Sequence, residues 1–570
     1  MPSVFWRIGC IACVAALVLV GIDWGLPAAE TAAPLFGDRP AWDGQALAQF
    51  DADRVNAGVG ADVDRDPVQK TAEPVPLNPD DAARAGIVRR FKLFSHQPDE
   101  MITFMALQQM NPAAREFDPR LYQYGGAWIY PVGGLLKAAG QIGWIDLKAD
   151  KAFYYDNPAA FGKFYVVARL YTLAGYVLLI TTVGMILWRL TKDDAVSGVG
   201  AAVVGLLPVV FAMGHEAKPH IAGCAWVLMT ALAAARWVRS GAWRDALLTG
   251  LFTGLAGGTV LSAGIVAVIP MTMVLLRRET FSLRPDGVGR RIGTLVVVGV
   301  VAMVVFAVTN PYVILHAVHR DPVLTSNLGN TQAMYRVGDI EDLFRDGALR
   351  LLDALSWPMA ALAGVAFFMA ITRQQRVSPL GILLTVPTLL VLIQFFAFAA
   401  GKPGEYARFA LLPTATLGML GVWALSTIRV AWLRRLGLIA TPVAVLAAGT
   451  WPYIAAFAAD VGPRNTRVKV AEAIEALPAG TLDLWAEPAP YATPAIDLWK
   501  WNLRLLPPNA APTGDVALRA IDDPAALPRV PVGYRRQIVT ADTPPAPITW
   551  ANKPFELLIK EKTETTVPSP

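Results

Sequence analysis

Two neighbouring carboxylates, Asp99 and Glu100, are the residues of this sequence best suited to do chemistry. They follow Pro98, which restricts the backbone before it, and precede the amphipathic run Met101–Met110, so we expect them in the first turn of a helix. A carboxylate held there could remove a proton from a hydroxyl group and make it a nucleophile. Carboxylates also occur at helix starts for structural reasons, so capping is the alternative interpretation of this pair.

The residues after the pair predict a position at a membrane surface. Ile102, Phe104, Met105 and Leu107 give the predicted helix an apolar face that could lie on a bilayer. The aromatic-rich segment Phe117–Tyr124 is also typical of the interface between lipid and water. A substrate attached to a lipid could therefore reach the carboxylates from the membrane.

A second polar cluster falls in a tight turn between two apolar blocks. It contains His215, Glu216, Lys218 and His220, and two histidines with a lysine in so short a turn could bind a phosphate group. Solvated charges at the tip of a loop are the competing interpretation. Metal binding is disfavoured because the spacing of the two histidines, with a proline between them, suits no common set of ligands.

Further polar positions lie at the ends of apolar blocks. Arg169 and Arg408 could meet a charged substrate there, although snorkelling of the long side chain toward water explains many arginines in such places. The run Asn310–Tyr312 follows another block, where a helix stop is enough to explain it.

The composition is that of an integral membrane protein. Of the 570 residues 54% are hydrophobic and only 17% are charged, and the mean hydropathy is +0.42. A soluble protein of this length could not hide so much apolar side chain, because polar residues must cover most of its surface. Cys10, Cys13 and Cys224 all fall inside apolar blocks, so no disulfide framework or thiolate metal site is predicted.

The apolar residues form about eleven blocks, most of them long enough to cross a hydrocarbon core. Because backbone groups in lipid must be bonded internally and the blocks lack a period of two, we predict transmembrane helices. The predicted spans cover residues 4–22, 165–188, 197–213, 221–237, 246–261, 263–276, 293–309, 352–371, 379–399, 409–427 and 438–457. The boundary between the fifth and the sixth is poorly defined. We interpret the first as an uncleaved signal-anchor, with a cleaved signal peptide as the alternative.

The Lys and Arg residues of the short loops predict the orientation. If the N-terminus is cytoplasmic, the inner loops carry most of them, and the short outer loops hold little more than Lys218, Lys402 and Arg408. The predicted inner residues are Arg189, Lys192, Arg236, Arg239, Arg244, Arg277, Arg278, Arg284, Arg290, Arg291, Arg373, Arg376, Arg429, Arg434 and Arg435.

Three large segments face outward in this topology, at about 23–163, 310–350 and 458–570. The first is a long outer loop that opens with a polar stretch and carries Asp99. The last begins with a helix-like run, Arg467–Ala476, and an alternating run, Thr481–Trp485, which predict a small C-terminal α/β domain; its tail, Lys560–Pro570, is expected to be disordered. The predicted organisation is a first span at 1–22, an extracytoplasmic loop at 23–163, the other spans at 164–457 and an extracytoplasmic domain at 458–570.

Short sequence motifs add one packing signal and exclude several chemistries. Gly250, Gly254 and Gly258 recur at four-residue spacing, which places them on one helix face and predicts close approach of another helix. The sequence contains no Walker-type phosphate loop, dinucleotide fingerprint, HExxH or GxSxG element. Chemistry would therefore have to come from scattered polar residues at the outer ends of spans.

With these residues the sequence resembles a known superfamily, the polytopic, lipid-phosphosugar-dependent glycosyltransferases with the GT-C fold. The nearest groups are bacterial protein-mannosyltransferase-related enzymes, which are glycosyltransferase family 39-like, and lipid A aminoarabinose-transferase-like enzymes. The run His96–Glu100 is similar to the family's His-Pro-Asp-Glu element in the first outer loop. Supporting matches are Asp23–Pro27, Ala168–Leu170, Gly254–Ala256, Asn310–Tyr312 and Arg408–Pro413, and the resemblance covers roughly residues 1–460.

The resemblance implies an inverting transfer of a sugar, on the outer face, from a polyprenyl-phosphate donor to an acceptor hydroxyl. It implies that Asp99 is the general base on the acceptor, with Glu100 as its neighbour or substitute. Basic residues would neutralise the leaving phosphate. The candidates for this role are His215, Lys218, His220 and Arg408, and the further candidates for substrate binding are His96, Arg169 and Glu216.

Three positions depart from the family's pattern. Gln97 separates His96 from the proline, His220 stands where the family often has an acidic residue, and Val260 stands where many members have a lysine. These departures concern the donor contacts and the activity more than the fold.

The resemblance also implies partners and a location. The partners are a lipid-linked sugar donor, the bilayer and a glycan, lipid or protein acceptor, with no nucleic acid; no cofactor is certain, and a divalent metal is left open. The expected location is the bacterial cytoplasmic membrane, with the N-terminus inside and the C-terminal domain outside. The alternatives are a transporter or flippase for a lipid-linked glycan and a non-catalytic assembly subunit. A transporter is disfavoured because no clear internal repeat occurs and charges gather at the ends of spans.

Overall fold

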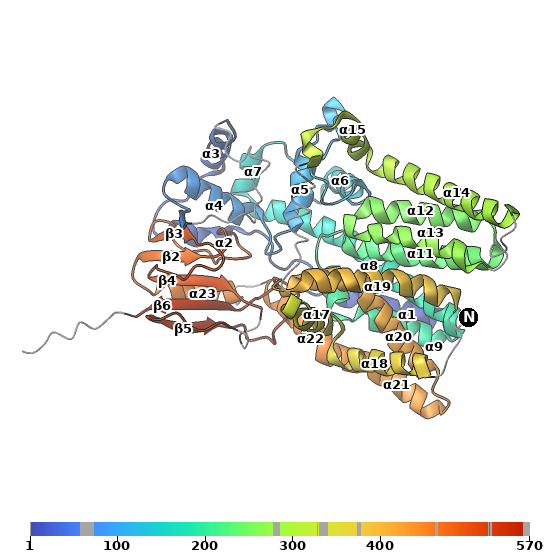
Figure 1. Ribbon diagram of the computed structural model, residues 1–570. Coiled ribbons are helices and arrows are strands. Elements are labelled where there is room, and N and C mark those ends of the chain that lie inside the picture. The colour runs from blue at the N-terminus through green and yellow to red at the C-terminus, as the bar shows by residue number, and fades with distance from the viewer. Residues whose placement is uncertain are drawn as a thin grey trace, which may run out of the picture. The chain divides into compact units, whose positions relative to one another are not determined.

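A computed structural model of the chain describes residues 2–56, 73–277, 285–325, 327, 329, 340–372, 378–461, 465–522, 524 and 527–561. Predictions on residues 57–72, on Arg278, Arg284, Arg373 and Arg376, and on the tail beyond Glu561 lie outside this described part. The chain forms two compact units (Figure 1). The membrane unit comprises Met1–Ile22, Ile102–Ala138 and Val167–Ile454, and the sheet unit comprises Asp23–Met101, Ala139–Val166 and Ala455–Pro570.

Helices make up the membrane unit, and several of them extend across its boundaries in the sequence. They are α1 (Pro2–Val18), α5 (Glu100–Gln108), α6 (Gly126–Gln141), α8 (Pro158–Thr191), α9 (Asp194–Gly205), α10 (Pro208–Gly214), α11 (His220–Ser240), α12 (Trp243–Thr259), η3 (Leu261–Ala267), α13 (Val268–Leu276), α14 (Pro285–Thr309), α15 (Pro311–His319), α17 (Ile340–Leu355), α18 (Trp357–Thr372), α19 (Pro379–Ala399), η5 (Gly404–Ala410), α20 (Leu411–Ser426), α21 (Ala431–Val445) and α22 (Trp451–Ala459).

The prediction of a polytopic helical membrane protein is confirmed. In the described residues six helical stretches are long and apolar enough to cross a membrane, and two bent pairs raise this to eight. The pairs are α9 with α10, bent by 69°, and α17 with α18, bent by 105°. Shorter apolar helices lie at Val4–Val18 and Leu261–Leu276, so the count of eleven spans stays a prediction. The ill-defined boundary between the fifth and sixth blocks lies at Val260, where extended backbone separates α12 from η3.

The glycine face of α12 packs closely against α14, as predicted. A Cβ atom on Gly250 would lie 2.8 Å from the carbonyl oxygen of Val298, and one on Gly254 would lie 2.6 Å from that of Ala302. Two backbones can approach this closely only where the side chain is a hydrogen atom. The four-residue spacing therefore encodes helix packing.

The sheet unit is built on six strands in the order β1-β3-β2-β4-β6-β5. They are β1 (Val75–Pro76), β2 (Gly480–Leu484), β3 (Trp501–Leu505), β4 (Val516–Ala520), β5 (Tyr534–Val539) and β6 (Phe555–Lys560). The helices of the unit include α2 (Ala29–Ala32), α3 (Gly44–Asn56), α4 (Asp81–Leu93), α7 (Lys151–Asp156) and α23 (Thr466–Glu475). β2 pairs in parallel with β3 and β4, and the other neighbours are antiparallel. The predicted C-terminal α/β fold is confirmed, with α23 and β2 at the predicted positions.

One hydrophobic core joins the first loop to the C-terminal segment. Val88 and Phe91 of α4 belong to the same buried cluster as Ile474 of α23, Leu482 of β2 and Trp501 of β3. The first loop also supplies the edge strand β1, which pairs with β3. Residues 23–101 and 139–166 of the first loop therefore form one unit with the C-terminal segment.

Candidate functional site

The two candidate carboxylates lie at the start of α5, which begins at Glu100, directly after Asp99. The Ser95 hydroxyl donates a 2.6 Å hydrogen bond to the Glu100 carboxylate, and the backbone N–H of Asp99 donates to the Gln97 side chain at 3.0 Å. Glu100 is fully buried, whereas Asp99 is partly exposed. Glu100 thus holds the turn together, and Asp99 is the carboxylate that a substrate can reach.

His96 is buried in the same turn, in the sheet unit. Its Nδ1 lies 2.8 Å from a carboxylate oxygen of Asp460, and its backbone N–H donates to the carbonyl oxygen of Gly25 at 2.8 Å. Neither partner was predicted from the sequence. The extra residue Gln97 is buried as well and caps the turn through its side-chain oxygen.

The polar turn before α11, in the membrane unit, is buried rather than solvated. Glu216 is 0% exposed and Lys218 is 1% exposed. The Lys218 ammonium lies 3.2 Å from Glu216 and 2.9 Å from Glu405, and Arg408 pairs with the same Glu405. The interpretation as solvated charges at a loop tip is wrong. These four residues, which we call the ion cluster, contain two cations and two carboxylates and so balance in charge.

His215 and Arg169 are tied to the chain that follows α1. The two ring nitrogens of His215 lie 3.1 Å from the carbonyl oxygen of Phe211 and 3.0 Å from that of Val20. Burial, and then the charge of Arg169, lower the pKa of His215 to about 4. Arg169 is fully buried and donates to the carbonyl oxygen of Ile22 at 2.8 Å, so snorkelling does not explain it. Both residues hold the end of the first helical segment against the bundle.

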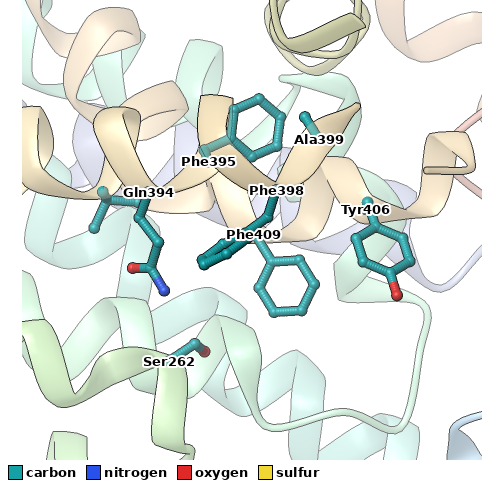
Figure 2. A pocket seen from close by; sticks show the side chains of 8 residues that line it. Ser262, Gln394, Phe395, Phe398, Ala399, Tyr406 and Phe409 are labelled. Carbon is teal, nitrogen blue, oxygen red and sulfur yellow. The ribbon is translucent and has the colours of Figure 1, made fainter. Parts of the chain in front are cut away.

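A cavity in the membrane unit is lined mainly by aromatic and aliphatic side chains of α19 and η5, with Ser262 of η3 on another wall (Figure 2). It has about 440 Å³ of space, part of it open to the outside. Its polar lining comes from Ser262, Gln394 and Tyr406. A second hollow of about 390 Å³ adjoins it through Ser262, Val391 and Phe409 and is lined in addition by His220, Val260 and Arg408.

His220 faces this second hollow from the start of α11. Its ring packs edge-on against Tyr124 and Phe409, with ring centroids 6.1 Å and 5.9 Å apart. Its Nδ1 is buried and has no hydrogen-bond partner in the described part of the chain. A buried ring nitrogen at a cavity wall suits a ligand that supplies the missing partner. Of the four predicted phosphate ligands, His220 and Arg408 line the second hollow, and Lys218 lies in the ion cluster with Arg408.

A further cluster, which the sequence analysis did not single out, lies beside α15. His316 bridges two carboxylates: its Nε2 lies 2.7 Å from Asp118, and its Nδ1 lies 3.0 Å from Asp321. Tyr122 donates to the other oxygen of Asp118 at 2.6 Å. These contacts fasten the aromatic segment 117–124 to α15. The available signal was that charged and aromatic residues occur together in residues 117–124 and 312–321, but this pattern does not predict which residues pair.

The contacts of Asp118 with His316 and Tyr122 are expected to break in acid. Burial alone would raise the pKa of Asp118, but hydrogen bonds from Tyr122, the Arg120 backbone and His316, with the charge of His316, hold it below its ordinary value. A carboxyl group whose pKa is lowered by folding stabilises the folded state at pH values above its ordinary pKa. This contribution to stability is lost as the pH falls through the lowered pKa. Hydrogen exchange in segment 117–124, corrected for the intrinsic pH dependence, should therefore stay slow at neutral pH and rise below about pH 4.

The Asp118→Asn variant provides the control for these contacts. It should exchange several-fold faster in segment 117–124 at neutral pH and should lose most of the acid-induced change. Equal exchange in the variant and the unmodified protein at neutral pH would show that Asp118 does not hold the segment.

Metal coordination finds no support in the described residues, which offer no group of three or more His, Cys, Asp or Glu side chains placed to hold an ion.

The chain matches no protein-family profile and no curated protein sequence. Among solved structures it is similar to ArnT from Cupriavidus metallidurans bound to undecaprenyl phosphate, with 14% identity and a TM-score of 0.41 over 66% of this chain and 67% of that one. The apo form of ArnT gives 14% identity and a TM-score of 0.41 over 81% and 92%. AglB, the oligosaccharyltransferase of Archaeoglobus fulgidus in complex with an inhibitory peptide and a dolichol-phosphate, gives 13% and 0.40 over 83% and 58%.

These neighbours are membrane glycosyltransferases with the GT-C fold, the superfamily that the sequence resembles. The chain spans less than two thirds of the length of AglB.

Proposed function

We propose that the protein is a membrane glycosyltransferase that moves a sugar from a polyprenyl-phosphate donor to an acceptor hydroxyl on the outer face. The observation that carries this proposal is the aromatic cavity whose neighbouring hollow is lined by His220 and Arg408. The sugar, the acceptor, the bacterial cytoplasmic membrane as location and the outward-facing C-terminal domain remain predictions from the sequence.

The cavity suits the lipid part and the phosphate of such a donor. Its walls include Phe395, Phe398 and Phe409, which offer an isoprenoid chain apolar contacts. Arg408 has five N–H donors, enough to bind Glu405 and a phosphate oxygen together, and His220 can add one hydrogen bond. Because the ion cluster is balanced in charge, geometry and hydrogen bonding rather than excess positive charge would hold the phosphate.

The proton transfer is assigned to Asp99, the accessible carboxylate at the start of α5. Asp99 takes the proton of the acceptor hydroxyl as the new bond forms between its oxygen and the anomeric carbon. The bond from that carbon to the phosphate oxygen breaks, and polyprenyl phosphate leaves with inversion at the sugar. Glu100 keeps the turn in place through Ser95.

Comparing cell envelopes tests the proposed function. Mass spectrometry of envelope glycans and glycolipids from cells with and without the protein should show at least one sugar modification that disappears with the protein. The unmodified gene should restore it and the Asp99→Asn variant should not. A transporter or an assembly subunit should tolerate both Asp99→Asn and Glu100→Gln. Restoration by Asp99→Asn would exclude Asp99 as the base, and restoration by both variants would exclude the enzymatic proposal.

Binding of undecaprenyl phosphate should depend on Arg408. The Arg408→Gln variant removes the cation that lines the hollow while Glu405 keeps Lys218 as a partner, and we expect roughly tenfold weaker binding, the loss of one charge-assisted hydrogen bond. Native mass spectrometry of the purified protein in detergent measures this. Undecaprenol, which lacks the phosphate, is the control ligand and should bind both forms equally. Equal affinity of both forms for undecaprenyl phosphate would show that Arg408 does not bind the donor.

A further inference from the structure

Three segments far apart in the sequence meet at one buried point in the sheet unit. They contribute Gly25, His96, Asp460 and Arg467, which we call the His96 node. One carboxylate oxygen of Asp460 lies 2.8 Å from His96 Nδ1, and the other lies 3.1 Å from a guanidinium nitrogen of Arg467. The Asp460 side chain is fully buried, and those of His96 and Arg467 are 6% exposed.

Arg467 orients the carboxylate of Asp460. Its Nε donates to the carbonyl oxygen of Pro490 at 2.6 Å, and a terminal nitrogen donates to that of Trp550 at 2.7 Å. The guanidinium is thereby locked in one orientation, so the carboxylate it binds is oriented too.

Gly25 confines the imidazole from the other side. Its φ is +58°, and a Cβ atom on it would lie 2.6 Å from the Cβ of His96. Its carbonyl oxygen accepts the backbone N–H of His96, and its own N–H donates to the carbonyl oxygen of Asp460 at 3.4 Å. The backbone and the ring of His96 are therefore both held in place.

We infer that Asp460 is a positioning residue for the turn that carries Asp99. Asp460 accepts the Nδ1–H of His96, which sets the ring orientation and leaves Nε2 as the other polar atom of the imidazole. Gln97, next in the chain, then caps the backbone N–H of Asp99. This inference rests on the proposed function, and it makes the C-terminal segment part of the catalytic apparatus, although neither Asp460 nor Arg467 is a catalytic residue.

Asp483 offers a matched control in the same unit. It is also fully buried, lies 2.7 Å from an arginine, Arg504, and accepts the backbone N–H groups of Thr513 and Gly514. An Asp→Asn change at either site disturbs the ion pair of a fully buried carboxylate, but only Asp460 binds a residue of the catalytic turn. Asparagine has one acceptor oxygen where the node needs two, so the Asp460→Asn variant mismatches either His96 or Arg467.

Hydrogen exchange decides whether the turn is positioned. In the full-length protein in detergent, Asp460→Asn should speed exchange in residues 94–100 several-fold, and Asp483→Asn should leave this segment as it is. Gly25→Ala, whose methyl group would contact His96 from the opposite side, should also speed exchange in residues 94–100. Unchanged exchange in Asp460→Asn, or an equal rise in Asp483→Asn, would overturn the inference. This measurement does not depend on whether the protein transfers sugar.

The rate of transfer gives the functional consequence. We expect Asp460→Asn to restore the missing envelope modification roughly tenfold to hundredfold more slowly at equal protein level, the cost of a small misplacement of a reacting group. Its affinity for undecaprenyl phosphate should stay unchanged. Asp483→Asn should restore the modification at nearly the normal rate, and a rate as low as that of Asp460→Asn would contradict the inference. If the unmodified protein produces no envelope modification, the proposed function fails while the exchange data still judge the positioning.

Discussion

The Asp99→Asn variant is expected to lose about 10²–10⁴-fold in the rate of sugar transfer, the usual contribution of a general base. The amide has nearly the shape of the carboxylate but cannot take a proton from the acceptor. The variant keeps the backbone N–H that donates to Gln97, so this hydrogen bond of the turn is retained. The rate at which the envelope modification reappears after induction measures the effect.

Two control variants separate the base from its surroundings. Asp80 caps α4 in the same unit by accepting the backbone N–H of Ala83, and Asn caps helices as well as Asp, so Asp80→Asn should transfer sugar at the normal rate. Glu100→Gln keeps an oxygen for the Ser95 hydroxyl and should cost far less than Asp99→Asn. If Glu100→Gln abolishes transfer and Asp99→Asn does not, the base is Glu100.

Local patterns in the sequence predicted the features whose causes are local. Pro98 and the apolar run after Glu100 were enough to place the start of α5, and the spacing of Gly250 and Gly254 was enough to predict the close approach of another helix. The alternating run at Thr481 predicted β2. In each case the signal and its structural effect lie within a few residues of each other.

Long-range pairings left no such signal. Nothing near His96 predicts Asp460 as its partner, because the contact joins residues 364 positions apart. The burial of Lys218 was missed for the same reason, since one of its carboxylate partners, Glu405, comes from a distant segment. A charge in a short turn looks solvated until its partners are known.

Two departures from the family's pattern lie on one cavity. His220 and Val260 line the same hollow as Arg408, although 40 residues separate them in the sequence. An acidic residue and a lysine at these two positions could form an ion pair, whereas histidine and valine cannot form one with each other. His220 and Val260 thus give this wall of the hollow fewer charges than the residues that the resemblance leads one to expect.

The Lys218→Met variant is expected to destabilise the membrane unit by roughly 3–5 kcal/mol, the cost of breaking a buried ion network by removing one partner. Glu405 would keep Arg408, whereas Glu216 would lose its contact with the Lys218 ammonium. Thermal unfolding in detergent should show a large fall in Tm. Arg345→Met, which removes one partner of an exposed pair with Asp342, is the matched control and should leave Tm nearly unchanged.

A double variant shows whether charge balance is the cause. Lys218→Met combined with Glu216→Gln removes one charge of each sign and should recover most of the lost Tm, because the cluster is again neutral. If the double variant is no more stable than Lys218→Met, the loss comes from packing around the lysine stem and not from the unpaired carboxylate. Recovery of Tm would mean that Lys218 is needed to neutralise its neighbours, which would leave Arg408 and His220 as the residues at the hollow that can contact a phosphate.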